Sequence, residues 1–132
     1  MIYTITIDGR FPSLNEYIEA NRAHKQKGNK MRKESEYIIS MYIMQQLRKV
    51  HIDKPVFIRY RFFEPNKKRD LDNISGYFHK VFQDSLVYNN VIHNDSWQYI
   101  TGFQDIFDVD NKHPRIEVEI IEQGFCTEQE DT

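Results

Sequence analysis

The fold is decided by the stretch from residue 55 to residue 73, which reads PVFIRYRFFEPNKKRDLDN. Its first half places apolar side chains on one face of an extended chain and mixed side chains on the other, which predicts a β-strand over residues 56–63. Glu64-Pro65-Asn66 ends that strand. Three cationic residues then run directly into two carboxylates, those of Asp70 and Asp72. The stretch therefore predicts a core strand that ends in a cluster of opposite charges.

After this stretch the pattern changes to helical spacing. Apolar residues recur at intervals of three and four from Asn73 to about Leu86, which predicts a helix with one buried side. Asp72 is placed to accept hydrogen bonds from the unpaired amides of the first turn, so we expect it to be the N-cap. Residues 88–96 are rich in turn formers and predict a loop that contains the acid Asp95.

Three further strands are expected. Residues 97–108 and 115–121 have strand-like composition, and the short polar segment 110–114 between them predicts a hairpin. At the other end of the chain, residues 3–7 alternate isoleucine and tyrosine with threonine, which is typical of a half-buried strand.

The region between the first strand and residue 55 predicts one long helix. Residues 12–23 are expected to form a short helix or an irregular piece. Residues 24–30 have no apolar side chain and predict a mobile cationic loop. From about residue 32 to residue 49 the apolar positions follow a helical stripe that covers more than half of the circumference. A stripe of that width indicates a second burial partner. The sequence leaves open whether this helix is sandwiched in the core or contributes to a subunit interface.

The element order β-α-β-α-β-β predicts an α/β (α+β) fold, a mixed sheet with helices packed on it. The 132 residues are one domain by length, and 39% of them are hydrophobic, enough for a single core. We expect the domain to span residues 1–122 and to be followed by a frayed acidic tail over residues 123–132.

Composition excludes several classes of protein. The single cysteine, Cys126, excludes a disulfide framework and a cysteine-type zinc site. No run of about 18 apolar residues occurs, so we expect a cytoplasmic protein with no membrane partner. The histidines lack zinc-type spacing, the five glycines are isolated and form no phosphate-binding loop, and no serine lies in a nucleophile elbow.

The net charge of −2 hides two cationic regions. Between residues 20 and 33 there are basic residues and no acid, and a second basic group surrounds the end of the strand at 56–63. The basic residues of the two regions are Arg22, Lys25, Lys27, Lys30, Arg32 and Lys33, then Arg59, Arg61, Lys67, Lys68 and Arg69. One charge run alone is usually a solvated surface, but two runs, one of them beside clustered acids, favour a phosphate backbone as the ligand.

Clustered carboxylates next to cations suit an enzyme that holds a polyanion and a divalent metal together. Mg²⁺ and Mn²⁺ prefer oxygen ligands, so a metal nuclease brings two to four carboxylates to one point. Asp70 and Asp72 can share a face if they lie in extended backbone before the helix, and Asp95 can join them if the loop folds back. The alternative is that Asp-x-Asp only caps the helix. An EF-hand loop is excluded, because Ile74 stands where an oxygen ligand is needed.

Three motifs carry a resemblance to a known family. The segments 69–73 (RDLDN), 80–86 (KVFQDSL) and 91–95 (VIHND) together resemble the RusA family of Holliday-junction resolvases. The order of elements also fits over nearly the whole chain. The resemblance implies a dimeric, Mg²⁺-dependent endonuclease, with Mn²⁺ able to substitute, that cuts four-way DNA junctions and needs no small-molecule cofactor. It implies that Asp70, Asp72 and Asp95 are the metal-binding catalytic acids.

Two positions depart from the family pattern. Asn94 stands where the family has the first acid of an Asp-Asp pair, which leaves Asp95 as the ligand. Gly76 stands in the region of the family's catalytic lysine. Alignment on Asp84 and Asp95 selects Lys80 instead, with four extra residues that move the amine about 6 Å along the helix. The alternative for Lys80 is a solvated lysine on the polar face.

The expected function is resolution of four-way DNA junctions by a homodimer, since two related strands must be cut across a two-fold junction. The phosphates would be held by the cations of both regions, Lys67, Lys68, Arg69, Lys25, Lys27, Lys30 and Arg32. Aromatic residues such as Tyr17 or Phe11 are possible wedges at the branch point, although core packing is their commoner use. The alternatives are a nuclease of the same fold that acts on other branched DNA, and a non-catalytic protein that binds branched DNA.

Overall fold

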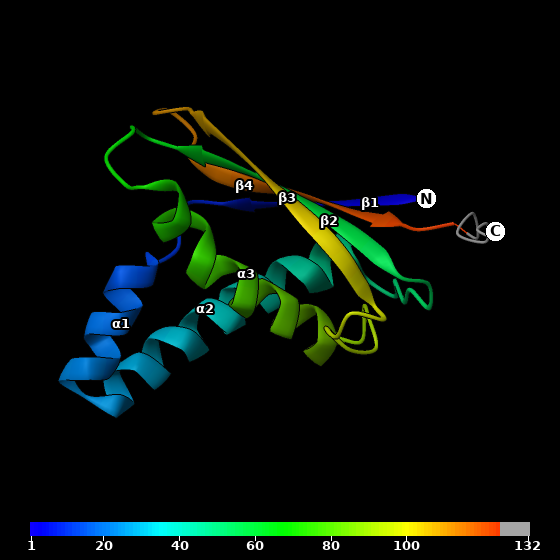
Figure 1. Cartoon of the computed structure of the whole chain (residues 1–132), viewed down its shortest axis with the longest axis horizontal. Coiled ribbons are helices and arrows are strands. Elements are labelled where there is room, and N and C mark those ends of the chain that lie inside the picture. Colours follow the sequence, from blue (N-terminus) through cyan, green and yellow to red (C-terminus); the bar gives the residue numbers. More distant parts are fainter. Residues whose placement is uncertain (125–132) are drawn as a thin grey trace.

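The computed structural model describes residues 1–124 and contains one four-stranded sheet and three helices (Figure 1). The strands are β1 (Ile2–Asp8), β2 (Val56–Glu64), β3 (Ile100–Val109) and β4 (Arg115–Glu122). The helices are α1 (Leu14–Ala23), α2 (Lys25–Gln46) and α3 (Leu71–Tyr88). Helices α2 and α3 lie against the same face of the sheet, and α1 projects beyond it. The end of the predicted acidic tail, residues 125–132, lies outside the described residues.

The sheet is mixed, which confirms the predicted fold class. Its strand order is β1-β4-β2-β3, with β2 and β3 parallel and the other neighbours antiparallel. The predicted hairpin of β3 and β4 is wrong, because β2 lies between these two strands. The N–H of Asp110 donates to the carbonyl of Glu64 at 2.8 Å, so the connection from β3 to β4 passes the end of β2. Helix α3 is the crossover between the parallel strands β2 and β3.

Strand β2 is the centre of the core. The face predicted to be apolar is fully buried and contains Val56, Ile58, Tyr60 and Phe62. The aromatic ring of Phe62 lies 5.8 Å from that of Phe78 on α3, which is one of several ring contacts that join sheet and helix. The opposite face of the sheet is charged, and there Arg59 donates to Glu119 across the strands at 2.6 Å. One face of the sheet is thus covered by helices and the other carries ion pairs.

The cationic loop predicted for residues 24–30 is wrong, because residues 25–30 form the start of α2. His24 caps the helix, and its Nδ1 accepts the N–H of Gln26 at 3.2 Å. The two helices α1 and α2 approach closely at Gly28, where a Cβ atom would lie 1.8 Å from Oδ1 of Asn21. The glycine that suggested a loop is therefore a packing residue of a helical hairpin.

The wide apolar stripe of α2 is only partly buried. Ile39 and Ile43 are in the core, as is Leu47 just after the helix, whereas four apolar side chains on the outer face are exposed: Tyr37, Ile38, Met41 and Met44. Of the two alternatives that the sequence left open, burial of these four in a core sandwich is not seen in the single chain. We name them the outer face of α2.

The loop that carries Asp95 is anchored at its start. Ile52 and Ile92 form an isolated parallel bridge, and both are buried. Nδ1 of His51 is 2.7 Å from the carbonyl of Asn90. That hydrogen bond raises the pKa of His51, and the neighbouring Asp53 adds to the effect. The contacts hold the loop against the segment that leads into β2.

No helix within residues 1–124 is both long enough and apolar enough to cross a membrane.

Candidate functional site

Asp70 and Asp72 lie at the N-terminus of α3. The helix begins at Leu71, so Asp70 is the N-cap and the prediction that Asp72 takes this position is wrong. Asp70 has extended backbone (φ −70°, ψ 155°), and its carboxylate forms no capping hydrogen bond. Asp72 belongs to the first turn, where the helix dipole favours a negative charge. Both residues are exposed, so their carboxylates are open to a ligand from solvent.

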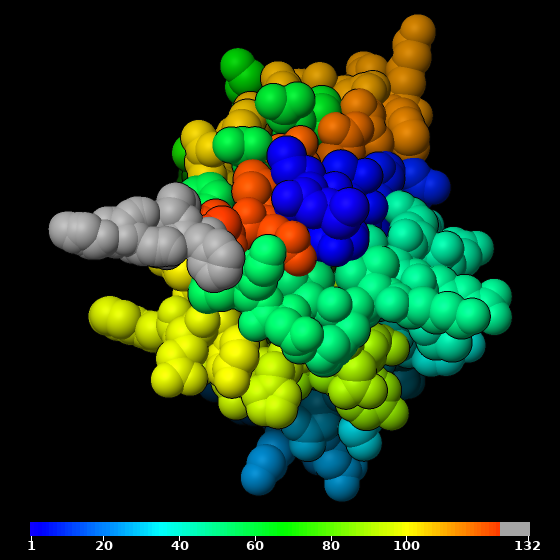
Figure 2. Space-filling view, turned by 90° about the vertical axis from the view of Figure 1, so that its right-hand side faces the viewer, coloured from blue at the N-terminus to red at the C-terminus, as the bar shows by residue number. Residues whose placement is uncertain are grey.

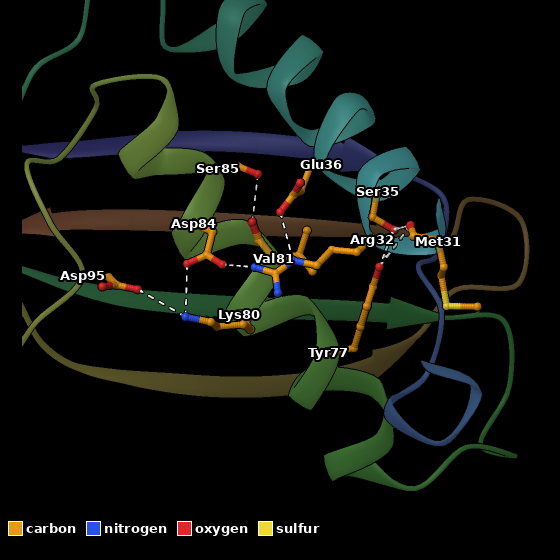
Figure 3. A network of polar contacts seen from close by, with 10 residues as sticks. All are labelled: Met31, Arg32, Ser35, Glu36, Tyr77, Lys80, Val81, Asp84, Ser85 and Asp95. Atoms are coloured by element: carbon orange, nitrogen blue, oxygen red, sulfur yellow. Dashed lines mark hydrogen bonds and ion pairs between the residues drawn. The ribbon is translucent and has the colours of Figure 1, made fainter. Parts of the chain in front are cut away.

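Asp95 lies beside Lys80 and Asp84 (Figure 3). Nζ of Lys80 is 3.2 Å from Oδ1 of Asp84 and 3.7 Å from Oδ2 of Asp95. The amine therefore points toward the C-terminal half of α3, because Asp84 is one turn further along the helix. The lysine side chain is 62% exposed.

The three predicted ligands do not come together in one chain. Asp72 and Asp84 are twelve residues apart on a continuous helix, which corresponds to about 18 Å along its axis. Asp95 lies with Asp84, and therefore beside the other half of α3 from Asp70 and Asp72. Within residues 1–124 no group of three or more His, Cys, Asp or Glu side chains is arranged to hold a metal ion. The set of three acids thus does not fit a single metal centre built by one chain.

Arg32 joins α2 to α3 instead of standing free (Figure 3). Its guanidinium donates to Glu36 at 3.0 Å and, through a second nitrogen, to Asp84. Burial alone would lower the pKa of Arg32, but the hydrogen bond to Glu36 and the charge of Asp84 outweigh it, so the pKa is raised. Asp84 is thereby shared between Arg32 and Lys80. These contacts make Arg32 part of an interhelical network.

Arg69 is also occupied within the fold. It donates to the carbonyl of Phe11 at 2.9 Å and lies 3.7 Å from the carboxylate of Glu64, which also accepts from Arg10 at 2.8 Å. Its side chain is largely buried, and desolvation lowers the pKa of the guanidinium. Arg69 therefore ties the turn after β2 to the segment before α1.

The lysines predicted to bind DNA are exposed. Lys67 and Lys68 precede α3, next to Asp70 and Asp72, and remain open to solvent. Lys25, Lys27 and Lys30 lie on the first turns of α2, where they are exposed on the helical hairpin. The segment from residue 20 to residue 33 contains no acid. The structure therefore presents two lysine groups, one beside the acid pair and one on the helical hairpin of α1 and α2.

Some residues of this region have no signal in the sequence. Nε2 of His79 is 2.7 Å from Oδ1 of Asp105, and its ring lies 4.5 Å from that of Phe103. Sequence spacing could not reveal this pair, because it depends on how α3 crosses β3. The two suggested wedges, Phe11 and Tyr17, pack against aromatic residues of α3 instead.

No family model matches this chain, and no curated protein is significantly similar to it.

Proposed function

We propose that this chain is a structure-selective DNA endonuclease of the RusA type, which resolves four-way junctions by phosphodiester hydrolysis with Mg²⁺ or Mn²⁺ in the cytoplasm. The observation that carries the proposal is the exposed pair Asp70 and Asp72 at the start of α3, next to the exposed Lys67 and Lys68. Carboxylates that make no capping bond, placed beside free cations, suit a ligand that combines a metal ion with a phosphate chain.

The pair of acids supports a site that DNA completes. Mg²⁺ is usually bound by one or two carboxylates together with waters and substrate phosphates, so Asp70 and Asp72 would hold it without a third ligand from the same chain. When bound, such an ion neutralises a phosphate and lowers the pKa of a coordinated water. Lys67 and Lys68 would hold the phosphates that flank the cut. Asp95 and Lys80 form a second position along α3.

DNA arms would contact the helical hairpin. Lys27 and Lys30 lie about 60° apart around the axis of α2 and share a face, whereas Lys25 lies on the opposite side of the same turns. Helix α1 packs closely against α2 at Gly28, beside these lysines. Each phosphate neutralised by a lysine releases counterions, so binding would weaken steeply as salt rises.

A homodimer is part of the proposal. A four-way junction has two-fold symmetry, and two cuts at related positions need two copies of the site. The outer face of α2 supports this expectation, because four apolar side chains on one helix face are exposed in the single chain.

The test is cleavage of a synthetic four-way junction, a flap and a linear duplex of matched sequence, each with Mg²⁺, with Mn²⁺ and with EDTA. The proposal expects metal-dependent, symmetric cuts in the junction only. Equal cleavage of flaps would favour a nuclease for other branched DNA, and tight junction binding without any cleavage would favour a non-catalytic binding protein. Asp72→Asn should abolish cleavage and retain binding; full cleavage by this variant would contradict the metal assignment. Asp95→Asn, assayed in parallel, measures whether the second position contributes.

A further inference from the structure

A hollow of about 430 Å³ lies where the end of the α3–β3 loop meets β3. It is lined by Gln83, Asp95, Trp97, Ile100, Thr101, Gly102 and Phe103. This volume falls within the range of about 300–1,000 Å³ that small-molecule sites occupy. In Figure 2 the yellow segment, which contains the end of the loop and the start of β3, forms part of the surface at the end of the molecule that faces the viewer.

The aromatic side chains of this hollow are unusually open. Trp97 is 92% exposed and Phe103 is 52% exposed, although both have large apolar faces that burial would stabilise. Trp97 is also the only tryptophan of the chain. An aromatic ring left in water beside a hollow is suited to stack on a flat ligand.

The polar groups of the hollow are mostly acceptors. The Asp95 carboxylate only accepts hydrogen bonds when ionised. The amide nitrogen of Gln83 donates to the hydroxyl of Tyr60 at 3.0 Å, which orients the side chain and leaves its oxygen free to accept. Lys80, whose amine is 3.7 Å from Asp95, places a cation at the same side chain. A complementary ligand has a flat ring, N–H donors on its edge and an attached anion.

We propose that this hollow binds an unstacked nucleobase of DNA that carries an amino group, with the ring against Trp97 and the amino group donating to Asp95. Guanine, adenine and cytosine offer an exocyclic amino group, whereas thymine does not. The inference rests on the proposed function, since a branch point is where bases leave the stack at low cost. Lys80 would then face the phosphate of the same nucleotide.

The test uses the fluorescence of Trp97 in the full-length chain, titrated with single-stranded dC, dA and dT oligonucleotides without divalent metal. The absence of metal keeps any role of Asp95 as a ligand out of the measurement. We expect quenching by dC and dA at concentrations several-fold lower than by dT. Polarisation of labelled oligonucleotides should show that Trp97→Ala weakens binding of the dC oligonucleotide by about 5- to 100-fold. Trp97→Phe should retain most of the affinity.

Two further variants make the test specific. Tyr88→Ala removes another exposed aromatic side chain, at the end of α3, and should leave oligonucleotide binding unchanged. Asp95→Asn adds a donor at the edge of the hollow and should reduce the preference of dC over dT.

The outcomes separate this inference from the proposed function. The nucleobase site would be overturned by oligonucleotide binding without quenching of Trp97, or by a loss of fluorescence that depends on the protein concentration and not on the added oligonucleotide. Neither result would contradict the proposed cleavage of junctions. Quenching with base preference in a protein that cuts no junction would support the site and contradict the nuclease.

Discussion

Replacement of Arg32 by methionine should destabilise the fold without changing the electrostatics of DNA binding. Arg32 donates charge-assisted hydrogen bonds to Glu36 and Asp84, and its side chain is 33% exposed. Bonds of this kind contribute about 1.5–3 kcal/mol each when buried and less when water competes. Because methionine retains the packing of the aliphatic stem and Asp84 keeps Lys80 as a partner, we expect a loss of about 1–2 kcal/mol in the free energy of unfolding.

The matched control is Lys30→Met, two residues earlier on α2. Lys30 is exposed, so this change should alter the free energy of unfolding by less than about 0.5 kcal/mol. Urea unfolding followed by circular dichroism measures the stability of both variants. The urea concentration at the midpoint should fall for Arg32→Met, with an unchanged m value.

In the salt dependence of DNA binding, Lys30→Met should have the larger effect and Arg32→Met the smaller one. If Lys30 contacts one phosphate, Lys30→Met should reduce the dependence of log K on log salt by about 0.9, and Arg32→Met should leave this slope unchanged. The reasoning is refuted if Arg32→Met is as stable as Lys30→Met and lowers the slope. In that case Arg32 would leave Asp84 to bind phosphate.

Three more outcomes are expected. Lys80→Met should change the free energy of unfolding by less than about 1 kcal/mol, because exposed ion pairs contribute little. The same variant should slow junction cleavage by about 100-fold or more if the amine stabilises the transition state. The control Lys112→Met changes an exposed cation with no assigned role and should alter neither the stability nor the cleavage rate. The raised pKa of His51 stabilises the fold below pH about 6.5, and this stabilisation is lost as pH rises through the pKa of the folded state. His51→Gln should therefore flatten the pH profile of stability. An NMR titration midpoint of His51 at or below about 6.5 would contradict the raised pKa. Met41→Lys places a charge on the outer face of α2 and should convert a dimer to a monomer in light scattering, with unfolding of the monomer unchanged.

Strands could be predicted from sequence because their signal is local. The alternation of residues 56–63 recurs as the buried face of β2, and the stripe of Ile39 and Ile43 recurs as the buried side of α2. The start of α2 could not be predicted, because Gly28 is needed there for close packing against Asn21, which belongs to another element. The pairing of β3 also depends on the whole chain, since proximity in sequence favours a hairpin and the sheet instead places β2 between β3 and β4.

In the candidate site too, local features could be predicted from the sequence and contacts between distant segments could not. Sequence spacing identified Asp70 and Asp72 at a helix start, which is a local relation. The helix predicted from Asn73 to about Leu86 is present within the 18-residue α3, but the sequence did not show that the following loop places Asp95 beside Lys80, away from that pair. The ion-pair partners of Arg32 and Arg69 could not be predicted either, because a sequence does not distinguish an exposed cation from a paired one. Trp97 and Phe103 gained significance only from their exposure around one hollow.

The position of β4 has a consequence for how the protein is made. In the described sheet β1 pairs only with β4, and β4 lies between β1 and β2. At a synthesis rate of about 5–20 residues per second, roughly 5–20 s separate the appearance of β1 from that of β4. During that interval β2, α3 and β3 are available to associate, while the first strand has no partner on the ribosome. The sheet is then closed by insertion of β4 between β1 and β2. A nascent chain stalled before Arg115 would leave open the edges of β1 and β2 that β4 otherwise pairs with.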